Sequence, residues 1–254
     1  MIFDTHAHYD DKAFDDDRQT ILSSMISNGV GRIVNVGANL SGSRRSIELS
    51  KEYDFVYAAV GVHPDDAAEI TEEGLAKLYE MTQNDKVVAV GEIGLDYYWN
   101  KENKEVQIDA FRKQIDLAQQ VGKPIIIHSR DAAEDTVRIL RECDAGRNGG
   151  VVHCFSYSKE IAREAIALGF YIGIGGVLTF SNAKKVKETV AEIPIERIVL
   201  ETDCPYLAPV PHRGERNNSS YLPLVVEEIA GIKGISAEEV MSVTYDNACK
   251  MYRL

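Results

Sequence analysis

The chain has 254 residues, of which 44% are hydrophobic and 27% are charged, as in an ordinary globular protein. Its net charge of -12 at pH 7 excludes a broad basic surface for non-specific nucleic-acid binding, but it does not exclude a phosphate substrate. No apolar run approaches the roughly 20 residues of a membrane span, and no signal-peptide pattern opens the chain. The 4 cysteines are scattered without a C-x-x-C pair, so we expect reduced thiols and a cytoplasmic location.

Short apolar or β-branched runs recur along the chain and predict strands. Most of the intervening stretches repeat apolar residues at helical spacing, as do Ile108, Phe111, Ile115 and Ala118. Strands that alternate with helices pair in parallel, and eight such units in a chain of this length fit a (β/α)8 TIM barrel of the α/β class. The strands are expected at residues 2–5, 32–36, 55–62, 87–93, 124–128, 150–154, 170–174 and 198–201.

Two further helical patterns follow the eighth predicted strand and indicate additional C-terminal helices. The last begins at Ser236 with Glu239 three residues later, which is the spacing of a capping box. No linker or low-complexity tract divides the chain, so we expect one barrel domain over residues 1–254. An open doubly wound sheet is the alternative, but the glycines at 173, 175 and 176 lack the spacing of its nucleotide-binding fingerprint.

Polar side chains gather where the predicted strands end, and that end of a TIM barrel carries the active site. Glu92 and Asp203 follow apolar runs, where a carboxylate is rarely buried without a partner. His212 lies in the loop after the eighth strand, on the same face. The other five of the six histidines each end a predicted strand: His6, His8, His63, His128 and His153.

The spacing of His6 and His8 predicts a metal site. Residues two apart in a strand project to the same side, where two neutral imidazoles can hold one ion. Glu92 can share this ion, and Asp203 can bind it while holding the attacking water. Salt bridges are the simpler explanation for each carboxylate alone, but the whole set favours metal.

His128 and His153 can hold a second ion, with Glu92 as the bridge between the two. We therefore expect one or two divalent ions, such as Mg, Mn, Zn or Ni, and the residue types do not choose among them. Cys154 and Cys204 neighbour two of these residues, but strand alternation is expected to turn both thiols away from the site.

Six short segments at the predicted strand ends form a recognisable set. They are DTHAH at 4–8, GVHP at 61–64, GEIGLD at 91–96, PIIIHSR at 124–130, HCF at 153–155 and ETDCP at 201–205. Together they resemble the TatD family of metal-dependent deoxyribonucleases, which belongs to the amidohydrolase-like barrels. The resemblance implies that His6, His8, Glu92, His128, His153 and Asp203 bind one or two divalent cations. It also implies hydrolysis of phosphodiester bonds, mainly in DNA and often from the 3′ end.

The sequence departs from the family pattern near the mouth of the expected site. Tyr9 stands where the family usually has an aliphatic residue, and Glu215 replaces a usual lysine. Asn218 and Ser219 replace a usual Glu-Pro pair. These changes leave the expected metal ligands intact and bear on the choice of substrate.

The resemblance allows roles to be assigned to individual residues. Asp203 is the expected general base and is catalytic together with Glu92. Arg130 is placed to hold a phosphate oxygen, unless it forms a structural salt bridge. His63 is expected to contact the phosphate or leaving group, unless it only locks the turn before Pro64.

Arg213 and Arg216 are expected to bind the nucleic-acid backbone, unless they only solvate their loop. Two divalent ions would make the pocket net positive against Glu92 and Asp203. The acidic surface outside should slow the capture of long duplexes, so we expect DNA ends or single strands as partners of a monomeric enzyme. Hydrolysis of a small ester, amide or phosphoester, or of D-aminoacyl-tRNA, is the alternative, and metal or partner binding without turnover is a third.

Overall fold

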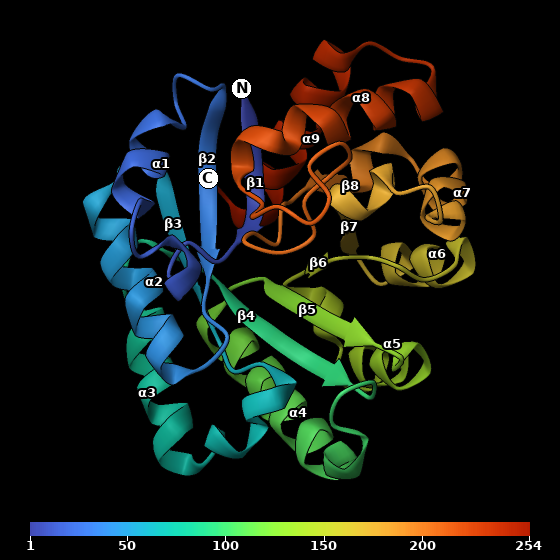
Figure 1. The fold of residues 1–254 in the computed structure, drawn as a ribbon. Helices are drawn as coiled ribbons and strands as arrows, with labels where there is room; N and C mark the ends of the chain where they lie inside the picture. The colour runs from blue at the N-terminus through green and yellow to red at the C-terminus, as the bar shows by residue number, and fades with distance from the viewer.

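The computed structural model describes residues 1–254, and its centre is one sheet of eight parallel strands. The strands follow chain order around the sheet, and each pairs in parallel with the next. Figure 1 shows them at the centre of the molecule with the helices outside. The strands are β1 (Ile2–Ala7), β2 (Val30–Val36), β3 (Val56–Val60), β4 (Val87–Asp96), β5 (Ile125–Arg130), β6 (Gly150–Val152), β7 (Phe170–Ile174) and β8 (Ile198–Leu200).

The barrel closes between its first and last strands through residues just beyond β8. Ala7 forms an isolated parallel bridge with Cys204. The His8 N–H donates to the Cys204 carbonyl at 2.9 Å, and the Asp203 N–H donates to the His6 carbonyl at 2.9 Å. The closure therefore brings the HxH segment beside the segment that carries Asp203.

Nine α-helices surround the sheet, and their ends follow local chemistry. Ser236 caps the last helix by accepting the Glu239 N–H at 3.1 Å, as its spacing predicted. Gly122 ends the fourth helix in the left-handed conformation, with φ at 69°. The helices are α1 (Arg18–Ser24), α2 (Leu40–Glu52), α3 (Glu72–Thr82), α4 (Lys104–Val121), α5 (Ala133–Glu142), α6 (Lys159–Ala167), α7 (Lys184–Glu192), α8 (Leu222–Lys233) and α9 (Ala237–Tyr252).

Alternate strand residues fill the interior of the barrel. In β5, Ile126 belongs to one apolar cluster, whereas its neighbours Ile125 and Ile127 belong to another that includes helix residues. The interior cluster also contains Met251 and Tyr252 of α9, and the Tyr252 hydroxyl donates to the Thr5 carbonyl at 2.8 Å. Helix α9 thus covers the end of the barrel where the strands begin, which leaves the carboxyl ends of the strands open.

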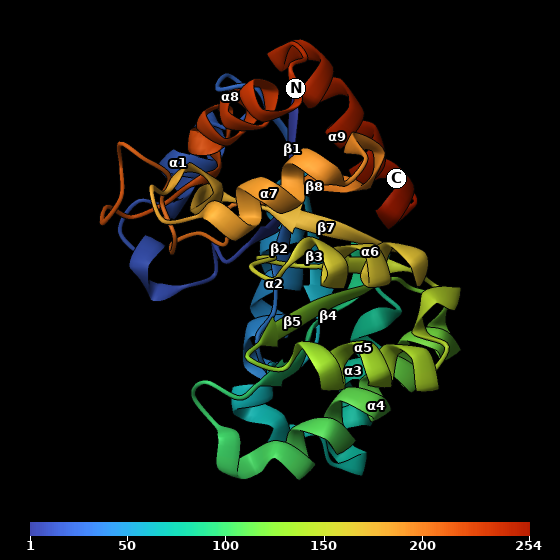
Figure 2. The same ribbon diagram turned by 90° about the vertical axis from the view of Figure 1, so that its right-hand side faces the viewer.

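The predicted α/β TIM barrel with additional C-terminal helices is confirmed. All eight strands lie where the apolar runs placed them, although their ends differ. Strands β1, β4 and β5 continue beyond the predicted ends, to Ala7, Asp96 and Arg130, whereas β3 and β6 end two residues earlier than predicted. None of the helices is both long and apolar enough to span a membrane. Figure 2 shows the loops that follow β1 and β8, in blue and orange, on one side of the molecule, where the predicted site residues lie.

Candidate metal centre

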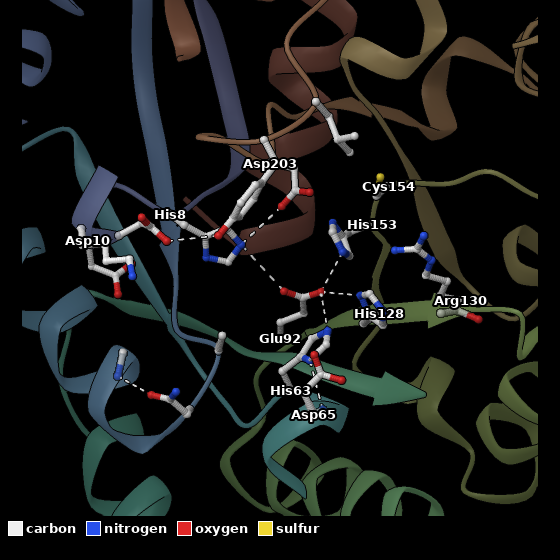
Figure 3. A pocket seen from close by; sticks show the side chains of 18 of the residues that line it. His8, Asp10, His63, Asp65, Glu92, His128, Arg130, His153, Cys154 and Asp203 are labelled. Carbon is white, nitrogen blue, oxygen red and sulfur yellow. Dashed lines mark hydrogen bonds and ion pairs between the residues drawn. The ribbon is translucent and has the colours of Figure 1, made fainter. Parts of the chain in front are cut away.

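The carboxylate of Glu92 lies at the centre of the histidine cluster (Figure 3). Its Oε1 atom is 2.7 Å from Nδ1 of His128 and 2.8 Å from Nε2 of His153. Glu92 lies within β4, His128 within β5, and His153 directly after β6. Three neighbouring strands therefore present one oxygen and two ring nitrogens to a single point.

The second oxygen of Glu92 faces a different group of ligands. Its Oε2 atom is 3.4 Å from Nε2 of His6 and 3.8 Å from Nε2 of His8. Oδ1 of Asp203 lies 3.4 Å from Nε2 of His8, and the two Nε2 atoms are 3.0 Å apart. The two oxygens of Glu92 thus divide the other five predicted ligands into two sets, with His128 and His153 on one side and His6, His8 and Asp203 on the other.

This donor set fits divalent cations. Ligand atoms of His6, His8 and Asp203 all lie within 4.8 Å of one another, and so do those of His63, Glu92 and His128. Imidazole and carboxylate ligands suit Mg, Mn, Zn or Ni, and a shared carboxylate is a common bridge between two ions. The arrangement does not distinguish one bound ion from two.

The electrostatics of the cluster keep its carboxylates ionised. Burial raises the pKa of Glu92, but His153 and His128 outweigh it and hold the pKa well below its usual value. Burial likewise opposes ionisation of Asp203, and a hydrogen bond from His8 lowers its pKa. Burial works against protonation of His8, yet Asp203 raises its pKa to about 9. Bound cations would replace these protons as the partners of the carboxylates.

Asp96 is a residue whose role the sequence analysis did not assign. Its Oδ2 atom lies 3.0 Å from Nε2 of His128, the ring nitrogen that points away from Glu92. A carboxylate in this position orients a metal-binding imidazole and increases its basicity. The signal was available, since Asp96 is four residues after Glu92 in a strand and therefore projects to the same side.

Two more buried carboxylates support the ligands from behind. Oε1 of Glu201 accepts the Cys154 N–H and lies 3.7 Å from Nδ1 of His153. Asp4 accepts hydrogen bonds from the Thr202 hydroxyl at 2.7 Å and the Ser219 hydroxyl at 2.6 Å. Burial raises the pKa of Asp4 to about 7, although these hydrogen bonds oppose the shift.

Two departures from the family pattern contact each other. The Tyr9 hydroxyl and the Ser219 hydroxyl are 2.8 Å apart, and the Ser219 N–H donates to the Tyr9 hydroxyl at 2.9 Å. Ser219 also donates to Asp4, so the two substitutions form one buried network beneath the loop that follows β8. This network ties that loop to β1.

A cavity of about 910 Å³ opens above the cluster and is lined by five of the six predicted ligands, all but His6. Cys154 also lines it, which corrects the expectation that its thiol turns away. Strand β6 ends at Val152, and Cys154 adopts a φ of 45°, so strand alternation does not apply there. Cys204 is fully buried and does not line the cavity, as alternation predicted.

His63 and Arg130 both line this cavity. Nε2 of His63 is 3.9 Å from Oε1 of Glu92, while its Nδ1 accepts the Asp65 N–H at 3.2 Å, so it serves the turn and faces the site. Burial lowers the pKa of His63 to about 4. Arg130 has no carboxylate within 4.0 Å and instead lies over the Tyr98 ring, 4.2 Å from its centroid. The alternative of a structural salt bridge for Arg130 is therefore wrong.

Arg213 and Arg216 lie outside the cavity lining. Arg216 donates to Oδ1 of Asp17 at 2.9 Å and stacks on Phe14, with 4.8 Å between its Cζ and the ring centroid. Arg213 lies over the Phe180 ring at 4.4 Å. The structure thus gives both residues intramolecular partners, and their contact with nucleic acid stays a prediction.

An eight-stranded barrel with clustered histidines and carboxylates at the carboxyl ends of its strands is the architecture of a metal-dependent TIM-barrel enzyme. The family model described as TatD related DNase matches residues 3–253. The chain belongs to this family and is a metal-dependent hydrolase.

Similar proteins span the whole chain. The uncharacterized metal-dependent hydrolase YabD of Bacillus subtilis is 49% identical over 254 residues, which cover 100% of both chains. YcfH of Escherichia coli, described in the same words, is 36% identical over 260 residues, covering 100% of this chain and 96% of that protein. The crystal structure of the Escherichia coli TatD homologue YjjV has a TM-score of 0.94 and 30% identity, covering 100% of this chain and 98% of the other.

Proposed function

We propose that this hydrolase cleaves phosphodiester bonds of DNA, removing nucleotides from the 3′ end of single-stranded or short DNA. The observation that carries the proposal is the division of five predicted ligands between the two oxygens of the sixth, Glu92, beside an open cavity that Arg130 lines. The description of the matching family as a DNase supports the choice of DNA. The four free thiols support the proposed cytoplasmic setting, and we propose a monomer.

The residues divide the chemistry among themselves. Divalent ions, when bound by the two sets, supply positive charge that ionises water and offsets charge on the phosphate. Asp203 accepts a proton from the attacking water, whose oxygen bonds to phosphorus. The bond from phosphorus to the 3′ oxygen breaks, and that oxygen takes a proton from solvent, releasing a 5′ mononucleotide. Arg130 holds a phosphate oxygen, and His63, neutral at pH 7, contacts the phosphate or the leaving oxygen.

The test is cleavage of 5′-labelled single-stranded DNA with Mg²⁺ or Mn²⁺, with wild type beside Asp203→Asn. We expect products shortened stepwise from the 3′ end, with a rate about 10²–10⁴-fold lower in the variant and no cleavage after chelation. Asp16→Asn is the matched control, because it removes the same charge from an exposed turn. A folded, metal-loaded wild type that leaves DNA intact would direct attention to small esters or D-aminoacyl-tRNA. Equal cleavage by wild type and variant would indicate a contaminating nuclease.

A further inference from the structure

The loop that follows β4 carries two large aromatic side chains in an exposed position. Tyr98 is 56% exposed, and Trp99, the only tryptophan of the chain, is 64% exposed. Their ring centroids are 4.7 Å apart, and the ring planes meet at 89°. Rings left this exposed add little to the stability of the fold, and an exposed apolar pair packed against the cavity-lining Arg130 is typical of a ligand-binding surface.

The aromatic pair is held rigidly with respect to the metal centre. Oδ1 of Asp96 accepts the N–H groups of both Tyr98 and Trp99 at 2.9 Å. The other oxygen of the same carboxylate contacts His128. The side chain of Gln107 donates to the Asn100 carbonyl at 2.8 Å, which fixes the far side of the loop. One carboxylate therefore positions both the backbone that carries the two rings and the imidazole of His128.

Arg130 connects the aromatic pair to the cavity. Its Cζ atom is 4.2 Å from the Tyr98 ring centroid and 5.6 Å from that of Trp99, and its side chain lines the cavity. No side chain of the protein accepts a hydrogen bond from its guanidinium, so its donors are free for a ligand. Aromatic faces beside an unpaired cation are the combination that binds bases and backbone of single-stranded nucleic acid.

The charge on the opposite rim of the cavity also favours binding of a DNA strand on the side of Arg130. Asp10, Asp11 and Asp15 line the cavity there with one lysine, Lys12, and Arg45 on that side is paired with Asp10 at 3.3 Å, so this rim stays net negative. Figure 3 shows Asp10 and Arg130 on opposite sides of Glu92. A DNA strand is repelled by the rim that carries Asp10 and attracted by the rim that carries Arg130. We therefore expect the strand to extend from the metal centre past the aromatic pair.

We propose that Trp99, Tyr98 and Arg130 form a binding site for the unpaired part of a DNA strand, in which a base stacks on Trp99 while Arg130 contacts the adjoining phosphate. The site deepens the proposed nuclease function and rests on it. It requires an unstacked base, which a paired duplex does not offer. Strands with single-stranded ends are thus preferred over blunt duplexes.

Trp99 itself reports on this site, because it is the only source of tryptophan fluorescence. We would titrate the Asp203→Asn protein in Mg²⁺ with a single-stranded decamer and with an abasic decamer carrying the same phosphates. Binding of each is followed in parallel by anisotropy of a label on the DNA. Stacking predicts that the normal decamer quenches the tryptophan and that the bound abasic decamer does not. Equal quenching by both, or binding of the normal decamer without quenching, would overturn the proposal.

Kinetics provide the second readout. Trp99→Ala should raise the KM for single-stranded DNA about tenfold or more. Trp99→Phe should stay close to wild type, as should Tyr79→Ala, which removes an aromatic ring that is 42% exposed on α3. Tyr79→Ala should also hydrolyse methyl p-nitrophenyl phosphate, which has no base, at the wild-type rate. In Trp99→Ala, the loss of kcat/KM should be larger for single-stranded DNA than for methyl p-nitrophenyl phosphate. An unchanged KM for DNA in Trp99→Ala would overturn the stacking site while the nuclease function stands. A wild type that cleaves no DNA would overturn the nuclease function, and the fluorescence titration would then decide the stacking site alone.

Discussion

Two arginines near the mouth of the barrel, Arg130 and Arg216, both stack on aromatic rings, yet they are engaged differently. Arg216 lies over Phe14 and forms an ion pair with Asp17, which occupies its planar donor edge. Arg130 lies over Tyr98 with no carboxylate partner and lines the cavity. An aromatic neighbour therefore says little about the role of an arginine. The availability of its N–H donors separates a residue that stabilises a loop from one that can bind substrate.

The largest expected effect is on metal affinity and concerns Asp96, whose carboxylate contacts both His128 and the loop that packs against Arg130. Asp96→Asn should weaken metal binding about 10–100-fold, because His128 loses the partner that orients its ring. Calorimetric titration with Mn²⁺ measures this effect. The matched control is Asp135→Asn, whose carboxylate contacts Tyr97 and Lys104 near the same loop but not His128. Equal metal affinity in wild type and Asp96→Asn would contradict the role given to this carboxylate.

Arg130→Ala should lower kcat/KM for single-stranded DNA about 10–100-fold, the loss expected for a hydrogen bond between charged groups. The thermal midpoint should stay close to wild type, because the side chain is exposed and makes no ion pair. The slope of log KM against log salt concentration should fall by about 0.7, the value for one phosphate contact to a single strand. A large drop in thermal midpoint with unchanged kinetics would show that Arg130 stabilises the fold and does not bind substrate.

Arg216→Ala should show the opposite pattern. Loss of a half-exposed ion pair and of the stack on Phe14 should cost about 1 kcal/mol or less, lowering the thermal midpoint by about 2–4 °C at most. Its kcat/KM for DNA should stay within about twofold of wild type, and its salt slope should not change. Steady-state kinetics at several salt concentrations measure both the kcat/KM and the salt slope. A reduced salt slope would instead support the sequence-based prediction that Arg216 contacts the DNA backbone.

The smallest effect is the pH dependence of the same ion pair. The hydrogen bond from Arg216 lowers the pKa of Asp17 below the value of about 3.9 that it has in an unfolded chain. The stability contributed by this carboxylate is therefore complete above the unfolded pKa and is lost as the pH falls through the folded pKa. The difference in thermal midpoint between wild type and Asp17→Asn should be constant from about pH 5 to 7 and shrink in more acidic solution. A difference that grows on acidification would contradict the pairing.

Much of the fold was predictable because its signals are local. Each strand shows as a short apolar run, and the helices show as apolar residues at helical spacing, so their alternation indicates a parallel barrel. The six predicted ligands could be named because strand ends in such a barrel converge. Strand ends were less predictable. Polar residues such as Asp96 and Arg130 continue their strands by pairing with each other, which an apolar pattern does not reveal.

Other features depend on contacts between residues far apart in the chain. The hydrogen bonds between Tyr9 and Ser219 join positions 210 residues apart. No local pattern indicates that these two residues contact each other. The same holds for Cys154, whose side chain faces the cavity because its backbone leaves the strand conformation after β6.

The sequence by itself determined the barrel and the set of residues that meet at its open end. Periodicity and strand alternation are properties of short segments, and His6, His8 and Glu92 lie on such segments. Only the tertiary structure decided how the predicted ligands divide between the two oxygens of Glu92, and that the N–H donors of Arg130 are free whereas those of Arg216 are paired with Asp17. Both depend on the closure of β1 against the segment after β8 and on side chains such as Asp17 and Tyr98, whose positions are set by the whole chain.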